Sequence, residues 1–105
     1  MKTFGTIISE ARRTLGMSQK ELAAKIRKED GQAISAQYLN DIEHGRRNPP
    51  SEFLIVQFAT LLKLDKDVLI LAAGMIPQDL QRMAATQPDK MEQAFKAFRK
   101  AIKKP

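Results

Sequence analysis

The chain has 105 residues, of which 43% are hydrophobic and 29% charged, so we expect one compact domain rather than a disordered chain. It contains no cysteine, which excludes disulfides and cysteine-based metal sites. His44 is its single histidine. Eighteen Lys and Arg against twelve Asp and Glu give a net charge of +6, which favours polyanionic partners. We expect a cytoplasmic protein without metal or cofactor, because no apolar run is long enough for a membrane span and no signal peptide is recognisable.

The basic charge is concentrated towards the C-terminal end. Residues 1–76 carry eleven Lys or Arg against nine Asp or Glu, a net charge of +2. Residues 77–105 carry seven against three, a net charge of +4. The total charge therefore does not locate a nucleic-acid site, and only the placement of individual residues can do so.

Apolar residues recur at helical spacing along almost the whole chain, which predicts an all-α protein without a sheet. The first helix begins after Thr3 as cap and ends near Gly16. The second begins at Ser18, because Ser18 and Glu21 have the spacing of a capping box. The inward-facing residues are Phe4, Ile7, Ile8, Ala11 and Leu15 in the first helix and Leu22, Ala23 and Ile26 in the second.

Three further helices follow a polar stretch at residues 27–33, which contains the turn signal Asp30-Gly31. Their boundary residues are Ser35 and Gly45 for the third, Pro49, Pro50 and Ser51 for the start of the fourth, and Asp65 and Gly74 for the fifth. Their apolar residues are Leu39 and Ile42, then Phe53, Leu54, Phe58, Leu61 and Leu62, then Val68, Leu69 and Ala72.

Two helices are predicted beyond this five-helix unit, at residues 77–85 and Pro88–Lys103, because proline suits the first turn of a helix. One face of the last helix is apolar and carries Met91, Ala94, Phe95, Phe98, Ala101 and Ile102. That face either packs within the chain or forms a subunit interface. We therefore divide the chain into a domain at residues 1–76 and a helical extension at residues 77–105.

The sequence offers few groups for catalysis, because carboxylates occur singly on helix surfaces and neither a phosphate-binding loop nor the Ser/His/Asp order of a catalytic triad is present. The informative segment is residues 17–50, where two short helices joined by a loop can form a helix-turn-helix. The second of these, which we call the reading helix, has an outer face of Ala36, Gln37, Asn40 and Asp41, side chains short enough to approach base edges. Arg46, Arg47 and Asn48 follow it as phosphate-seeking groups.

The phrases LGMSQKELA, YLNDIEHGRRNPPS and LLKLDKDVL resemble the Cro/repressor-type helix-turn-helix family, often called the Xre family, over residues 4–76. The resemblance implies that Gln19 grips a phosphate and braces the reading helix, and that Arg12 and Glu43 form a partly buried ion pair. It also implies base contacts from Ala36, Gln37 and Asn40, and phosphate contacts from Arg46, Arg47 and Asn48.

The sequence departs from the family pattern after Ile26, where Arg27 replaces the usual glycine and residues 27–32 are extra. Either the first motif helix runs one turn longer or the loop projects, and Arg27 and Lys28 then contact phosphates or are simply solvated. Tyr38 either reaches a phosphate with its hydroxyl or packs its ring on this loop. Asp41 repels phosphate, which favours a surface or water-bridging role over reading cytosine.

The predicted function is sequence-specific binding of double-stranded DNA by a homodimer that regulates transcription, most simply as a repressor. The alternative is an antitoxin-type protein whose residues 88–103 bind a small partner protein while the helix-turn-helix regulates its own synthesis. An enzyme is the least favoured class.

Overall fold

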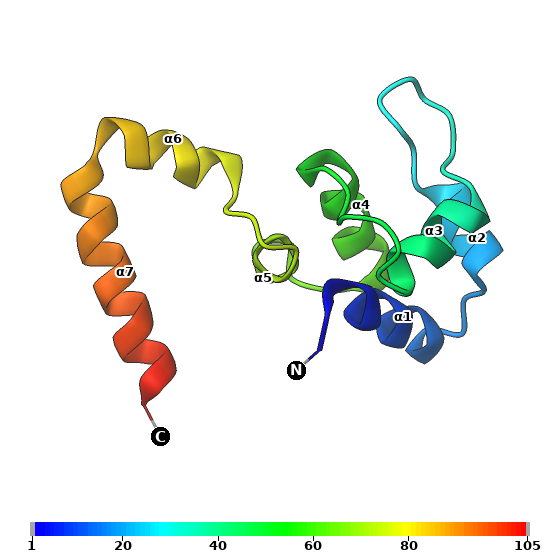
Figure 1. The fold of residues 1–105 in the computed structure, drawn as a ribbon, viewed down its shortest axis with the longest axis horizontal. Coiled ribbons are helices and arrows are strands. Elements are labelled where there is room, and N and C mark those ends of the chain that lie inside the picture. Colours follow the sequence, from blue (N-terminus) through cyan, green and yellow to red (C-terminus); the bar gives the residue numbers. More distant parts are fainter. Residues whose placement is uncertain (1, 105) are drawn as a thin grey trace. The chain divides into compact units, whose positions relative to one another are not determined.

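The computed structural model describes residues 2–104, which form seven α-helices and no strand (Figure 1). The helices are α1 (Phe4–Thr14), α2 (Gln19–Lys25), α3 (Ala36–Glu43), α4 (Glu52–Leu62), α5 (Lys66–Ala72), α6 (Gln78–Thr86) and α7 (Pro88–Lys103). The predicted all-α class is confirmed. The sixth helix begins one residue later than expected, because Pro77 lies just outside it as the N-cap.

Side-chain caps define where the first helices begin. The hydroxyl of Thr3 accepts a hydrogen bond from the Thr6 amide at the start of α1. At α2, Ser18 and Glu21 form the complete capping box, with each side chain bonded to the other residue's backbone N–H. Ser35 caps α3 in the same manner. These short polar side chains satisfy amides that no helical carbonyl reaches, so the sequence fixes the helix starts.

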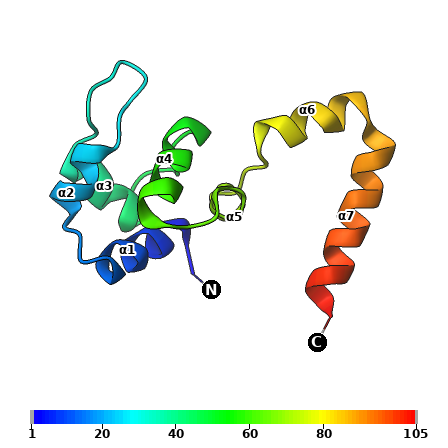
Figure 2. The same ribbon diagram turned by 180° about the vertical axis from the view of Figure 1, so that it is seen from behind.

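The chain divides after Met75 into two compact units. In the first unit, α1 packs on α3 and α4, α2 packs on α3, and α4 packs on α5 (Figures 1 and 2). These contacts enclose one apolar core, made of Phe4, Ile8, Leu22, Ala23, Ile26, Ile34, Leu39, Ile42, Leu54, Ile55, Phe58, Ala59, Leu62, Leu69 and Ile70. Burial of this apolar surface stabilises the unit, and the partly buried Ala73 and Met75 also pack against it.

Four apolar residues expected to face inward do not, and the first of them is Leu15, which is 38% exposed at the C-cap of α1. Phe53 is 48% exposed and Val68 is 66% exposed, and Ala72 is also exposed. In α5 the buried pair is Leu69 and Ile70 instead, because this seven-residue helix packs mainly on α4 and so has only a narrow buried stripe.

The helices α1 and α3 approach each other closely at Gly5. A Cβ atom at this position would collide with the backbone carbonyl oxygens of Ile42 and Glu43. Glycine is therefore required here by space rather than by backbone conformation. The contact brings the first turn of α1 against the last turn of α3.

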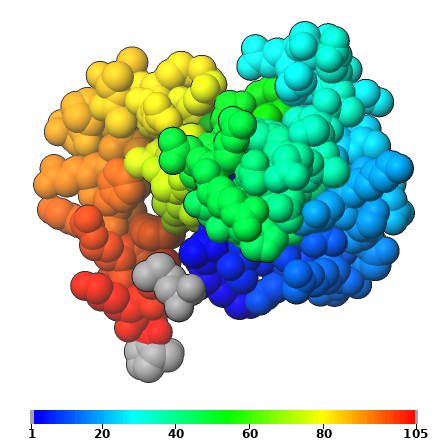
Figure 3. All heavy atoms as spheres, turned by 45° about the vertical axis from the view of Figure 1, so that its right-hand side comes forward, coloured from blue at the N-terminus to red at the C-terminus, as the bar shows by residue number. Residues whose placement is uncertain are grey.

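Residues 27–33 form a projecting hairpin, which resolves the alternatives left by the sequence. The helix α2 ends at Lys25, and Ile26 is already extended. Backbone bonds from Ile34 to Ile26 (3.0 Å) and from Lys28 to Gln32 (2.8 Å) pair the two sides of the hairpin, and Gly31 at φ +86° closes its turn. Figure 3 shows this segment in cyan, standing out from the surface of the first unit.

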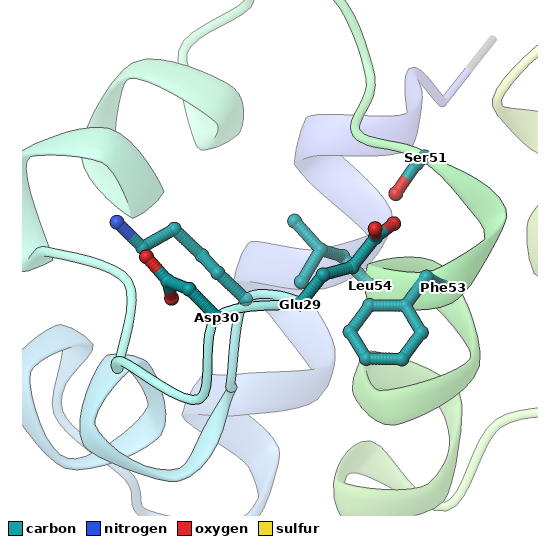
Figure 4. Close-up of a pocket in the computed structure, with 6 residues that line it drawn as sticks. Glu29, Asp30, Ser51, Phe53 and Leu54 are labelled. Carbon is teal, nitrogen blue, oxygen red and sulfur yellow. The ribbon is translucent and has the colours of Figure 1, made fainter.

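The tip of the hairpin does not close against α4. An open hollow separates the two, lined by Lys28, Glu29, Asp30, Ser51, Phe53 and Leu54. In Figure 4, the carboxylate of Glu29 reaches towards Ser51 at the start of α4, whereas Asp30 points to the opposite side. The hairpin is therefore held at its base rather than along its length.

The second unit consists of α6 and α7, which contact each other. Neither helix has a buried residue, and Phe95, Phe98 and Ile102 of α7 are 40%, 48% and 66% exposed. Among the described residues, no helix combines the length and the apolar character needed to cross a membrane.

Candidate nucleic-acid interface

The helices α2 and α3 pack on each other through fully buried side chains. Leu22 and Ala23 of α2 and Leu39 and Ile42 of α3 belong to the same core cluster. The small side chain of Ala23 leaves room for α3 to lie close against α2. The opposite side of α3 is consequently free to meet a partner.

That outer side of α3 carries Ala36, Gln37 and Asn40, which are predicted to contact bases, together with Asp41. Gln37 is exposed, whereas Ala36, Asn40 and Asp41 are half-buried. Because residues three and four apart share a helix face, Gln37 lies beside both Asn40 and Asp41. The Gln37 side-chain amide donates to Asp41 Oδ1 at 3.0 Å, so the two side chains are joined along the helix.

The end of α3 places the arginines that follow it. The Arg46 amide donates to the Asp41 carbonyl (2.8 Å) and the Gly45 amide to the Ile42 carbonyl (3.2 Å), with Gly45 at φ +71°. This is the Schellman arrangement, which reverses the chain sharply at the left-handed glycine. Arg46, Arg47 and Asn48 leave this turn exposed to solvent.

Two of these side chains have partners within the domain. The guanidinium carbon of Arg47 lies 5.5 Å from the centre of the Tyr38 ring, which packs half-buried against the core. Arg46 Nη1 lies 3.6 Å from Asp41 Oδ1, a loose ion pair at the surface. Tyr38 thus uses its ring for packing, on the core and under Arg47. A cation–π contact at this distance steadies Arg47 without neutralising it.

Beneath this surface lies a buried ion pair between α1 and α3. Arg12 donates through Nε (2.8 Å) and Nη2 (2.9 Å) to the two carboxylate oxygens of Glu43, and through Nη1 to the Met17 carbonyl (2.9 Å). The two side chains are 9% and 2% exposed. No buried polar side-chain atom in the described residues lacks a hydrogen-bond partner. A fully satisfied pair of this kind can be buried without a large penalty.

The pair shifts the protonation of both members. Burial alone would raise the pKa of Glu43, but hydrogen bonds from Arg12 and Gln19 outweigh it and hold that pKa below the ordinary value. The hydrogen bond to Glu43 raises the pKa of Arg12 despite its burial. Both groups are therefore charged at neutral pH.

Gln19 connects this pair to the outer face of α3. Its side-chain nitrogen donates to Glu43 Oε1 (2.9 Å) and to Asn40 Oδ1 (3.1 Å). These two bonds use both hydrogens of the amide, so the side chain braces α3 but keeps no donor for a phosphate. A phosphate contact at Gln19 then has to come from its backbone N–H, which lies in the first turn of α2 where amides lack helical acceptors.

Sequence reasoning missed the role of Gln57 in α4. Its side chain accepts from the Arg27 amide and donates to the Arg27 carbonyl, both at 2.8 Å, as a neighbouring strand would. This pairing holds the base of the hairpin at Arg27, and the hairpin leads into α3. The available signal was a lone amide within the apolar run of α4, since a polar group at the edge of a core needs a partner.

Comparison with known proteins places this arrangement in a family. The sequence model of the helix-turn-helix family matches residues 8–69, more than half of the chain. This chain belongs to the Xre-type helix-turn-helix family. The matched region covers the motif helices α2 and α3, the hairpin between them and α4.

Both a curated protein sequence and a solved structure are similar to this chain. The transcriptional regulator ClgR of Mycobacterium tuberculosis, in strains CDC 1551 / Oshkosh and ATCC 25618 / H37Rv, is 31% identical over 84 residues, which cover 80% of this chain and 69% of ClgR. A solved structure of a SinR protein/SinI protein complex matches with a TM-score of 0.54 at 22% identity, covering 94% of this chain and 99% of the matched chain. At 22% identity, this structural match supports the fold alone.

Proposed function

We propose that this protein is a transcriptional repressor that binds, as a homodimer, a two-fold-related operator in double-stranded DNA. Membership of the helix-turn-helix family already implies DNA binding. The proposal adds the polarity of regulation, the dimer, a cytoplasmic location and the residues that make the contacts. The observation that carries it is the outer face of α3, where Gln37 is exposed and joined to Asp41.

The size and chemistry of this face suit the major groove. An α-helix fits the groove, and amide side chains offer both donors and acceptors to base edges. Ala36 adds apolar contact for a thymine methyl group, and Asn40 adds a second amide near Gln37. Asp41 acts through Gln37 in this proposal rather than by contacting a base itself.

Phosphate contacts flank the reading face on both sides. Arg46, Arg47 and Asn48 are exposed directly after α3, and the first turn of α2 offers the Gln19 backbone N–H. We assign these groups to the backbone of the duplex, because backbone contacts set the register in which the helix reads bases. Tyr38 contributes by supporting Arg47, with its ring 5.5 Å from the guanidinium carbon.

The second unit supplies the dimer contact in this proposal. The helix α7 has an apolar face along its length, and Phe95, Phe98 and Ile102 are 40–66% exposed on it. An exposed apolar face of this kind needs a partner surface. The SinR protein/SinI protein complex, a structure with the same fold, favours one alternative occupant, a small partner protein bound by residues 88–103.

Selection of bound sequences from a random pool of DNA duplexes tests the function. We expect an enriched site with two related halves, because a homodimer presents two copies of α3. A site without symmetry contradicts the homodimer, and the absence of any enriched site contradicts specific binding.

A substitution connects the site to α3. Gln37→Ala is expected to relax the preference at one position in each half-site while leaving non-specific affinity nearly unchanged. Gln93→Ala, on the side of α7 opposite its apolar face, is the matched control and should return the wild-type site. If Gln37→Ala also returns the wild-type site, α3 does not read bases through Gln37.

A further inference from the structure

A chain of hydrogen bonds runs from the buried ion pair to the outer face of α3, and its direction is fixed by chemistry. A guanidinium group only donates, and an ionised carboxylate only accepts. Arg12 donates to both oxygens of Glu43, at 2.8 and 2.9 Å. Glu43 can therefore only accept from its second partner, Gln19.

The acceptor role of Glu43 determines how the side-chain amides of Gln19 and Asn40 are oriented. Since Glu43 Oε1 can only accept, Gln19 has to turn its amide nitrogen inward, at 2.9 Å. The same nitrogen donates its second hydrogen to Asn40 Oδ1 at 3.1 Å. Asn40 consequently keeps its oxygen inward and presents its Nδ2 group, which carries two hydrogens, on the outer face.

Asp41 orients the side-chain amide of Gln37 by engaging its nitrogen, whereas Gln19 engages the oxygen of Asn40. Its carboxylate accepts from Gln37 Nε2 at 3.0 Å and lies 3.6 Å from Arg46. One hydrogen of Gln37 is thereby used within the helix. The Gln37 side chain keeps one acceptor oxygen and one donor hydrogen for a partner.

We propose that Asp41 and Gln19 are positioning residues that determine specificity: Asp41 orients Gln37 to read adenine, and Gln19 orients Asn40 to read guanine or thymine. Adenine offers one donor and one acceptor in the major groove, which match the remaining groups of Gln37. Guanine offers two acceptors and thymine one, which match the outward donors of Asn40. The two neighbouring amides thus read different bases, although their side chains carry the same functional group.

This inference rests on the proposed function, because it assigns bases to a helix that has to lie in the major groove. It also differs from the general pairing of Asn and Gln side chains with adenine. That pairing treats each side chain as free to turn, whereas here each has one end engaged by a residue that cannot change its role.

Selection from a random duplex pool tests the inference with five variants of the full chain. Gln37→Ala first identifies the position that Gln37 reads, by the loss of its preference. Asp41→Asn keeps the shape but lets the side chain donate as well as accept, so Gln37 can turn over. At the same position we expect the preference for adenine over guanine, about tenfold or more in the wild type, to fall at least fivefold.

The double variant Gln37→Ala/Asp41→Asn separates positioning from direct contact. If Asp41 acts through Gln37, the double variant gives the same preferences as Gln37→Ala alone. If Asp41 contacts a base itself, Asp41→Asn changes a preference even when Gln37 is absent, and that result overturns its positioning role.

Gln19→Leu tests the other half of the inference. Without the inward donor, Asn40 can turn its oxygen outward, and adenine should become accepted at the position that Asn40→Ala identifies. Adenine or cytosine at that position in the wild type overturns the assignment, as does an unchanged preference in Gln19→Leu. A wild-type protein that enriches no site overturns the proposed function as well, whereas an enriched site with unchanged variants overturns only this inference.

Discussion

At the scale of single residues, the Arg12–Glu43 pair joins α1 to the end of α3 and supports the surface above it. Both side chains are at least nine-tenths buried, and every polar atom has a partner. Removing one member leaves a buried charge without compensation, which is far costlier than losing an exposed ion pair. We expect Glu43→Ala to lower the free energy of unfolding by about 3 kcal/mol in a urea titration at neutral pH. Equal stability of the two proteins would contradict this role.

The same pair predicts how stability varies with pH. The pKa of Glu43 is lower in the folded protein than the value of about 4.3 that a glutamate has in an unfolded chain. Between these two values the unfolded chain binds the proton and the folded one does not. The contribution of Glu43 is therefore complete above about pH 5 and is lost as the pH falls through the folded pKa. The difference in stability between the wild type and Glu43→Gln should shrink accordingly in urea titrations below pH 5.

The exposed arginines after α3 predict the salt dependence of binding. If Arg46 and Arg47 contact phosphates, binding releases the counterions condensed there, and affinity falls as salt rises. Either Arg46→Ala or Arg47→Ala should weaken binding to all duplexes similarly and reduce the slope of log affinity against log salt by about 1. Arg82→Ala in α6 removes the same charge and serves as the control. An unchanged slope in the Arg46 and Arg47 variants would exclude them as phosphate contacts.

At the scale of elements, the hairpin at residues 27–33 depends on one side chain from α4. Gln57 makes two hydrogen bonds of 2.8 Å to the backbone of Arg27. Gln57→Met keeps the length of the side chain and removes both bonds. One lost hydrogen bond is worth about 1 kcal/mol, so we expect hydrogen exchange of the Arg27 amide to accelerate at least about fivefold. The Leu69 amide in α5 is the internal control, and equal exchange at Arg27 would show that the hairpin holds itself.

The packing of α1 against α3 predicts a second effect at this scale. Gly5→Ala adds one methyl group that meets two backbone carbonyls, neither of which is the flexible end of a side chain. The helices then have to separate, which we expect to cost about 1–3 kcal/mol of stability. Arg13→Ala, an exposed substitution in the same helix, should change stability by less than about 0.5 kcal/mol. Thermal unfolding of the two variants distinguishes these outcomes.

At the scale of the whole molecule, the two units differ in how they bury apolar surface. The first has a complete core, whereas α6 and α7 have no buried residue. We expect the double variant Phe95→Ser/Phe98→Ser to weaken dimerisation at least about tenfold in sedimentation equilibrium, because these rings lie on the exposed face of α7. With it, affinity for a two-fold site should fall.

The control for this prediction is Gln93→Ser/Lys100→Ser, which changes the opposite side of the same helix. An unchanged dimerisation constant in the Phe95/Phe98 variant would exclude α7 as the homodimer contact. Co-purification of a small protein that the same variant loses would then favour the antitoxin alternative.

The starts of α1, α2, α3 and α5 were determined by the sequence because side-chain capping is local. Ser18 and Glu21 satisfy amides within three residues of themselves, and no distant part of the chain is needed to predict the start of α2. The reading face was predictable for a similar reason, since helical spacing alone places Gln37 beside Asn40 and Asp41. The family phrases added the pairing of Arg12 with Glu43.

The tertiary structure decided which groups on these elements remain available. Whether Gln37 and Asn40 present oxygen or nitrogen depends on Asp41 and on Gln19, and the second of these lies on another helix. Residues 27–32 project as a hairpin whose base bonds to Gln57, thirty residues further along the chain. Local spacing determines which face of a helix a side chain lies on. Its free donors and acceptors are those that remain after contacts between distant segments have formed.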